Sequence, residues 1–280
     1  MKTIAALQAW GNFSEYYSSM VGKIISDKYK LTITYNHDLN YLNQFDIVWA
    51  FFPQDPKTDV SKEKLVKTFW ELHEMGWNKG KINVACSQYA YRQLLWRDPN
   101  ALYAPFGVDS SIFTPKPHEN KIPVVGWCGQ EGNRRKQFDK LLALVHSIKE
   151  VQFYPNITKN FHGDVIGKYK TVPDVSKYYN MIDMYVCSSS SEGFGLPLLE
   201  ASSCGIPIIT FDVGIARELK QDGAGVIIVD DWDDMRDTII KMAKDKSWRE
   251  ELGLKSRKAT LSWWEWTRLA PRWLRVFDSV

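Results

Sequence analysis

The segment 188–211, SSSSEGFGLPLLEASSCGIPIITF, combines residue types that can bind a phosphate group together with hydroxyl groups. Serines and a Gly-Phe-Gly turn precede Pro197, and proline is common in the first turn of a helix because the N–H that it lacks would have no partner there. The segment therefore predicts a flexible loop, a helix that ends near Gly205 and Pro207, and a buried strand over 206–211. The free N–H groups at the start of such a helix carry partial positive charge and bind anions.

Two carboxylates flank this predicted anion site. Glu192 precedes the glycines, and Glu200 lies one helical turn beyond Leu196. A carboxylate beside an anion is unfavourable unless it accepts hydrogen bonds from hydroxyl groups, and two vicinal hydroxyls, as on a ribose, match its two oxygens. The predicted ligand is a phosphate between two polyols, such as a nucleotide-sugar. The alternative is an ordinary helix-start loop with a solvated Glu200. The turn residues expected to contact the donor are Gly193, Phe194, Gly195 and Leu196.

A second segment, GWCGQEGNRRK at 126–136, also indicates phosphate binding. A predicted strand ends in a glycine-rich loop, and three consecutive cations follow at the expected start of the next helix. Cations at a helix start oppose the helix dipole, so helix stability does not explain them. A phosphate held between the loop and the helix does explain them.

Together the two segments resemble the group 1, family 4 type retaining glycosyltransferases of GT-B fold. Glu192, seven residues and Glu200 match the E-x7-E signature of that family, whose usual text is close to EGFGLPLLEAMACGTPVI. The second segment is similar to the family's G-R-x-x-x-x-K-G, in which Arg and Lys clamp the donor diphosphate. Gln130 stands in place of that Arg, and the Lys aligns with either Arg135 or Lys136. Phe106-Gly107-Val108-Asp109 is similar to the N-G-V-D motif of the family, with Phe106 where Asn is commoner.

The resemblance implies a mechanism without a protein nucleophile. The acceptor attacks the face that the nucleotide leaves, and a phosphate oxygen of the leaving group takes the acceptor's proton. Arg135 and Lys136 would stabilise the departing diphosphate, Glu192 would hold hydroxyls of the donor sugar, and Glu200 would hold the ribose, whereas Arg134 is expected in solvent. Other implied donor contacts are Gly11, Gly129 and Gln130. The family's usual strand-end His has no counterpart in the strand predicted over 45–52.

The order of predicted elements favours an α/β fold with two facing Rossmann-like domains and a cleft between them. We expect an acceptor domain over 1–115, a nucleotide-sugar domain over 121–262, and a C-terminal helix over 263–280 that packs back on the first domain. The predicted strands are 3–7, 31–35, 45–52, 82–86, 124–128, 151–154, 184–187, 206–211 and 226–229. The predicted helices are 15–27, 61–75, 89–96, 137–149, 174–180, 233–245 and 248–261.

Two further patterns have alternative interpretations. Asp231-Trp232-Asp233 is a D-x-D, the metal-binding motif of GT-A glycosyltransferases, but here we expect Asp233 or Asp234 to cap a helix and no metal to be essential. Among the aromatic residues, the strand-end tryptophans are predicted to face the cleft and stack on a sugar or base, whereas the tail residues at helical spacing are predicted to pack in the core. The first group is Trp10, Trp49 and Trp127; the second is Trp263, Trp266, Leu269, Trp273 and Phe277.

Composition excludes several classes of protein. The 36 Lys and Arg nearly balance the 33 Asp and Glu, giving a net charge of +3 with no strongly basic half, so binding to a polyanion is not indicated. Four widely spaced cysteines are typical of reduced core thiols in a cytoplasmic protein. We see no leader and no apolar run of membrane-spanning length, so a soluble, cytoplasmic protein is expected and a membrane partner is unexpected.

The predicted function is transfer of a sugar from a nucleotide-sugar, UDP- or GDP-linked, to an unidentified acceptor without a cofactor. A glycan or small molecule is the favoured acceptor, and a lipid acceptor is disfavoured. The second hypothesis is a glycosyltransferase that acts on a modified base in DNA. The third, from another functional class, is a non-catalytic module that binds a nucleotide-sugar.

Overall fold

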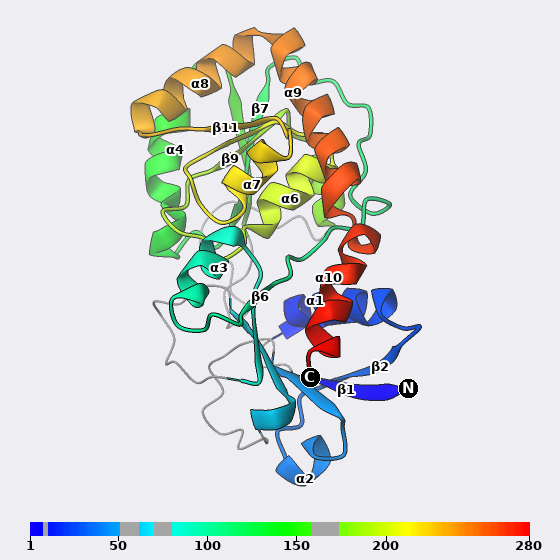
Figure 1. Cartoon of the computed structure of the whole chain (residues 1–280). Helices are drawn as coiled ribbons and strands as arrows, with labels where there is room; N and C mark the ends of the chain where they lie inside the picture. Colours follow the sequence, from blue (N-terminus) through cyan, green and yellow to red (C-terminus); the bar gives the residue numbers. More distant parts are fainter. Residues whose placement is uncertain (8–10, 51–61, 70–79, 158–173) are drawn as a thin grey trace. The chain divides into compact units, whose positions relative to one another are not determined.

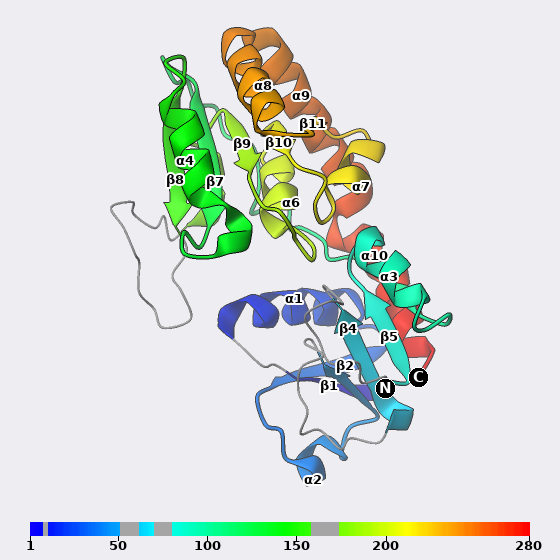
Figure 2. The ribbon, with the colours of Figure 1, turned by 90° about the vertical axis from the view of Figure 1, so that its left-hand side faces the viewer.

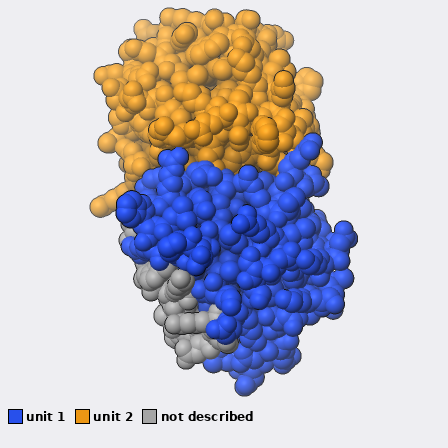
Figure 3. Space-filling model, in the orientation of Figure 1, with its two compact units in different colours: residues 1–107, 266–280 blue, residues 108–265 orange. Residues whose placement is uncertain are grey.

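The computed structural model describes residues 1–7, 11–50, 62–69, 80–157 and 174–280. The chain divides into two compact units: unit 1 contains residues 1–107 and 266–280, and unit 2 contains residues 108–265 (Figure 3). Unit 1 is thus discontinuous in sequence, because its last helix follows the whole of unit 2.

Unit 1 is built on a parallel six-stranded sheet in the order β2-β1-β3-β4-β5-β6 (Figure 1). Hydrophobic side chains dominate its inner strands because a parallel sheet covered on both faces buries every position. The strands are β1 (Lys2–Leu7), β2 (Tyr29–Thr34), β3 (Ile47–Ala50), β4 (Leu65–Phe69), β5 (Ile82–Ala85) and β6 (Leu102–Tyr103). The helices are α1 (Gly11–Ile24), α2 (Leu39–Leu42), α3 (Gln88–Leu95) and α10 (Trp266–Asp278).

Unit 2 is built on a parallel five-stranded sheet in the order β11-β10-β9-β7-β8, with α4 lying along β7 and β8 (Figure 2). The strands are β7 (Val124–Gly129), β8 (Gln152–Ile157), β9 (Met184–Cys187), β10 (Ile208–Thr210) and β11 (Val226–Ile228). The helices are α4 (Phe138–His146), α5 (Val175–Tyr179), α6 (Leu196–Ser203), α7 (Ala216–Gln221), α8 (Trp232–Lys244) and α9 (Lys246–Ala259), and a π-helical turn, η3 (Thr260–Trp264), follows.

The helix predicted over 61–75 is wrong in the part that the structure describes. A short turn, η1 (Lys62–Lys64), leads into β4, which pairs with β3 on one side and β5 on the other. All five residues of β4 are buried, including Lys67 and Thr68. Leu65 and Phe69 are four residues apart, which suits one face of a helix, but the same residues also fit a strand that is buried on both faces. Residues 70–75 lie outside the described residues.

The last helix completes the core of unit 1. The apolar face of α10 is buried, and Trp273 donates a hydrogen bond from Nε1 to the carbonyl of Pro105 at 3.0 Å. The ring of Phe106 stacks on that of Trp273 with 5.8 Å between centroids and also contacts Tyr17 of α1. Phe106 therefore fills the aromatic core of unit 1 at a position where the resembling family has Asn more often. Trp263 is an exception to the predicted packing stripe, because it lies on η3 and is 58% exposed.

Candidate functional site

The chain order of the strands in unit 2 reverses at β7, which lies between β8 and β9. In open α/β sheets, ligands bind outside the carboxyl ends of the strands at such a switch point, because the two following connections diverge there. The connections after β7 and β9 are the two segments that the sequence singled out. They meet through direct contacts between residues 127–136 and 188–192.

A half-buried ion pair joins the two segments. Lys136 Nζ lies 2.5 Å from Glu192 Oε1, and the two side chains are only 19% and 15% exposed. Ser189 Oγ donates a second hydrogen bond to the same carboxylate oxygen at 2.7 Å. Burial acts to lower the pKa of Lys136, but the Glu192 carboxylate, together with smaller effects of Cys187 and Cys128, offsets burial, and the pKa is raised. The ammonium group is therefore held charged at the carboxyl end of the sheet.

The backbone around the cations is fixed by serines of the opposite loop. Ser188 Oγ donates to the carbonyl of Lys136 at 2.5 Å and accepts from Trp127 Nε1 at 3.0 Å. The backbone N–H of Ser190 donates to the carbonyl of Arg135 at 2.8 Å. These bonds link the end of β7, the cationic turn and the loop after β9, so the position of Lys136 depends on both loops.

The sequence predicted the three cations at the start of the helix after β7, but they do not lie in its first turn. They form a separate 3-10 turn, η2 (Arg134–Lys136), in which Asn133 Oδ1 accepts from the N–H of Arg135 at 3.1 Å. Gln137 then adopts a left-handed conformation with φ of 48°, and α4 begins only at Phe138. Arg134 is exposed as expected, whereas Arg135 and Lys136 are half-buried.

Glycines shape both connections. A Cβ at Gly129 would lie 3.0 Å from the Trp127 ring and 3.4 Å from Lys136 Cδ, so a side chain there would crowd the cation. Gly195 takes a φ of 88° at the N-cap of α6, and no side chain caps that helix. Gly214 follows β10, where a Cβ would lie 2.2 Å from the carbonyl oxygen of Phe194. That close approach lets the N–H of Ile215 bond the same oxygen at 2.9 Å and hold the turn.

Glu200 projects from α6 and contacts α5. Tyr179 Oη donates to Glu200 Oε2 at 2.8 Å, while Oε1 receives no hydrogen bond from a described residue. Burial raises the pKa of Glu200 to about 7, although the bond from Tyr179 acts to lower it. One oxygen is therefore oriented by the protein, and the other can accept from a ligand hydroxyl when the group is ionised. Tyr179 was not predicted from the sequence, where nothing sets it apart.

The predicted donor residues of unit 2 thus belong to adjoining segments. Gly129, Gln130, Arg135 and Lys136 follow β7, and the residues from Glu192 to Leu196 follow β9 and start α6. The thiol of Cys128, at the end of β7, is influenced by charged groups of both segments. Burial and then the Glu200 carboxylate raise its pKa to about 12, whereas Lys136 acts to lower it. Gly11 is the first residue of α1 and belongs to unit 1.

The tryptophans predicted to stack on a ligand are core residues. Trp49 is fully buried, bonds Thr68 Oγ1 through Nε1 at 2.8 Å and packs against Trp273. Trp127 is 1% exposed and packs against Phe138, with ring centroids 4.6 Å apart. Both interpretations as stacking platforms are wrong, because the two rings are buried against Trp273 and Phe138. Trp10 lies outside the described residues.

The D-x-D sequence is part of a helix start. Asp231 is the N-cap of α8 and accepts from the N–H of Asp234 at 2.8 Å, so the capping residue is Asp231 rather than Asp233 or Asp234. Asp234 Oδ2 accepts in turn from the N–H of Asp230 at 3.2 Å. Within the described ranges, no group of three or more His, Cys, Asp and Glu side chains is arranged to hold a metal ion.

The model of the family "Glycosyl transferases group 1" matches residues 115–259, which includes both loops of this site. The chain belongs to this family. Among curated relatives, it is 38% identical over 77 residues to O-antigen chain mannosyltransferase B of Escherichia coli, a match that covers 28% of the chain and 20% of the relative. It is 33% identical over 149 residues to D-inositol 3-phosphate glycosyltransferase of Frankia alni, covering 51% and 33% respectively. The chain thus spans a third or less of the length of these two relatives.

Solved structures confirm the predicted GT-B fold of this family member. Sucrose-phosphate synthase from Thermosynechococcus elongatus has a TM-score of 0.77 at 13% identity, covering 99% of this chain and 98% of that one. HepE of Anabaena, in complex with UDP and glucose, has a TM-score of 0.78 at 11% identity over 100% of both chains. At such identities the likeness concerns the fold alone. The described residues include no helix with the length and hydrophobicity needed to cross a membrane.

Proposed function

We propose that the chain transfers a hexosyl or related sugar from a nucleotide-sugar to a glycan or small-molecule acceptor, with retention of anomeric configuration. The observation that carries this proposal is the half-buried Lys136–Glu192 pair at the switch point of unit 2, next to the start of α6. A half-buried cation held by one carboxylate can exchange that partner for a phosphate without losing its charge.

In the proposed reaction, the bond between the anomeric carbon and the diphosphate oxygen breaks while the acceptor hydroxyl attacks from the same face. A phosphate oxygen of the leaving group takes the acceptor's proton. Arg135, Lys136 and the N–H groups near Phe194 stabilise the charge that develops on the diphosphate. As Lys136 turns to the phosphate, Glu192 becomes available to the sugar hydroxyls. Glu200, oriented by Tyr179, accepts from the ribose hydroxyls.

The names of similar proteins support a nucleotide-sugar donor and a hexosyl group. One relative from Corynebacterium glutamicum is a GDP-mannose-dependent monoacylated alpha-(1-6)-phosphatidylinositol monomannoside mannosyltransferase, 23% identical over 264 residues, and HepE has been solved with UDP-glucose. Another, from Bacillus anthracis, is N-acetyl-alpha-D-glucosaminyl L-malate synthase. These names favour a UDP- or GDP-linked donor, and their acceptors are L-malate and a mannoside carried on phosphatidylinositol rather than a base in DNA.

The proposal is tested by release of UDP or GDP from a panel of nucleotide-sugars, with and without added acceptors. We expect release from a subset of the panel and a product with the same anomeric configuration as the donor, measured by NMR. Binding of a donor without turnover under any acceptor condition would instead support a nucleotide-sugar binding module. Release that persists with a chelator is expected, and restoration by manganese after its loss would contradict the metal-independent mechanism.

A further inference from the structure

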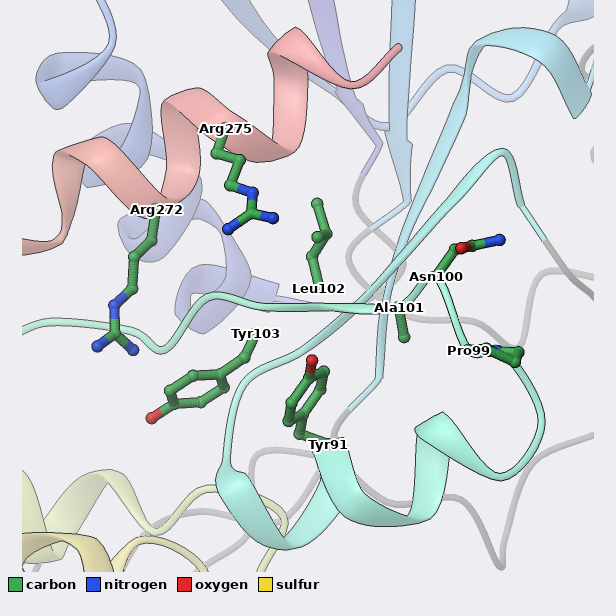
Figure 4. Close-up of a pocket in the computed structure, with 8 residues that line it drawn as sticks. All are labelled: Tyr91, Pro99, Asn100, Ala101, Leu102, Tyr103, Arg272 and Arg275. Atoms are coloured by element: carbon green, nitrogen blue, oxygen red, sulfur yellow. The ribbon is translucent and has the colours of Figure 1, made fainter.

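Unit 1 contains a pocket of about 570 Å³ between α10 on one side and α3 and β6 on the other (Figure 4). This pocket is formed entirely within unit 1, so it is separate from the residues of unit 2 described above. Its described lining residues include two arginines and no acidic side chain. The lining residues used below are Tyr91, Leu102, Tyr103, Arg272 and Arg275.

The two arginines are presented together by the helix. Arg272 and Arg275 are three residues apart on α10, which places them on the same face, opposite the buried face that contains Trp273. Figure 4 shows both side chains extending from α10 toward the β6 segment. Neither guanidinium forms an ion pair or a hydrogen bond with another described residue. The helix dipole favours a cation in the last turn of α10, but it does not account for two cations over one pocket.

Aromatic rings form part of the opposite wall. The guanidinium carbon of Arg272 lies 4.9 Å from the centre of the Tyr103 ring, a cation–π contact that limits the orientations of the guanidinium. The Tyr91 ring lies 5.8 Å from the Tyr103 ring, and Figure 4 shows Tyr91 rising from α3 toward β6. Leu102 adds an apolar surface beside these polar groups.

We propose that this pocket binds the phosphate group of a phosphorylated organic molecule. Two guanidinium groups supply two positive charges and forked N–H donors, which match a phosphomonoester carrying a charge between −1.5 and −2, whereas a carboxylate would neutralise only one of them. The pocket has the size of a small-molecule site and is larger than a phosphate needs, and its tyrosines and leucine suit an organic body. The same headgroup chemistry occurs in soluble phosphate esters and in lipids.

The test compares a soluble probe with a membrane probe. Phenyl phosphate is titrated into the full chain by calorimetry, and vesicles of phosphatidylcholine with and without phosphatidic acid are used in sedimentation. We expect saturable binding of phenyl phosphate, of phosphatidic acid vesicles, or of both, and the arm that binds more tightly identifies the source. The Arg272→Gln/Arg275→Gln double variant should bind at least roughly tenfold more weakly, because each charge-assisted bond contributes strongly to phosphate affinity.

Two single variants serve as controls. Arg268→Gln removes an exposed charge from the same helix outside the pocket lining and should leave binding unchanged. Lys136→Met alters the candidate donor site of unit 2 and therefore measures any phenyl phosphate that binds there, and its loss of binding should be smaller than that of the double variant. Absence of binding in both arms, equal binding by the double variant, or an equal loss in either control variant would overturn the proposal. Because both arginines are exposed, the double variant is expected to keep the melting temperature of the parent protein.

Discussion

At the scale of single residues, the cations of η2 should differ sharply in their importance. Substitution of Lys136 by Met should lower kcat by roughly a hundredfold or more, because a donor aimed at developing charge is typically worth that much. Arg135→Met should also lower kcat, whereas Arg134→Met should change it only slightly because Arg134 is exposed. Steady-state release of nucleoside diphosphate measures all three variants.

Removal of Lys136 also leaves the Glu192 carboxylate without its buried partner, so lost stability must be separated from lost chemistry. The Lys136→Met/Glu192→Gln double variant should regain melting temperature relative to Lys136→Met while kcat stays low. Recovery of kcat in the double variant would contradict the role of Lys136 in stabilising the leaving group. An Arg134→Met variant with the largest defect would indicate that the cations are misassigned by one or two positions.

Donor binding should depend on pH through Glu200. Its pKa of about 7 in the folded chain means that the carboxylate form gains population as pH rises from about 6 to about 8. If the ionised form accepts from the ribose, affinity for the nucleoside diphosphate should rise by up to about tenfold over that interval, because the ionised fraction of a group with a pKa of about 7 rises about tenfold. Glu200→Gln should bind more weakly at about pH 8 and lose this dependence. Calorimetry at several pH values measures it, and an unchanged affinity in the variant would contradict the assignment.

Ionisation of Glu200 should lower the stability of the folded chain, although it should favour donor binding. Because burial raises the pKa of Glu200 in the folded chain, the protonated form is the one that favours folding. Its contribution is complete below the ordinary glutamate pKa and is lost as pH rises through about 7. Glu200→Gln should therefore melt at a higher temperature than the parent protein at alkaline pH, and at a similar temperature in acid.

The sequence indicated the site residues because their types are unusual for their positions: cations after a glycine-rich loop, and carboxylates beside a helix start. It did not indicate Ser188, Trp127 or Tyr179 as their supports. Those contacts join segments that are 21 to 61 residues apart, and serine, tryptophan and tyrosine have many structural roles. The buried state of Trp127 follows from its packing on Phe138, which depends on the tertiary fold.

At the scale of elements, Ser188 should be essential to the alignment of η2 with the loop after β9. Ser188→Ala would leave the Trp127 N–H and the Lys136 carbonyl without their shared buried partner, at a cost of about 1–3 kcal/mol. We expect a lower melting temperature together with a reduced kcat. Ser147→Ala is the matched control, because Ser147 also donates to a backbone carbonyl, at 2.6 Å, but is exposed. Equal small effects of the two variants would contradict the role of Ser188.

Most strands and helices of unit 2 follow from periodicity, caps and the resemblance, because its parallel strands are short apolar runs bounded by polar loops. β4 of unit 1 shows where such arguments fail. A strand buried on both faces has no alternation of polar and apolar residues, and the spacing of Leu65 and Phe69 also fits one face of a helix. Only its pairing between β3 and β5 distinguishes the two possibilities, and pairing is not encoded in the local sequence.

At the scale of the whole molecule, alternation of strands and helices predicts the fold class, and the resemblance predicts its GT-B type. The pocket of unit 1 was not foreseen, since it combines α3, β6 and a helix about 170 residues later in the chain. Such a juxtaposition arises because unit 1 is closed by the C-terminal segment.

This discontinuity makes a prediction about stability. Trp273 is fully buried, stacks on Phe106 and Phe277, and bonds the Pro105 carbonyl, so it fixes α10 to the rest of unit 1. Trp273→Ala should destabilise the protein by about 3–5 kcal/mol, the range for truncation of a large buried aromatic residue. Urea denaturation followed by circular dichroism measures the change in the free energy of unfolding.

Trp263→Ala provides the matched control, because Trp263 is the same residue type, lies just before α10 and is 58% exposed. Its substitution should change the free energy of unfolding by no more than about 0.5 kcal/mol. If unit 1 unfolds separately, Trp273→Ala should shift only one of two transitions, since Trp273 has its contacts within unit 1. Similar effects of the two variants would mean that α10 does not stabilise unit 1 through this side chain.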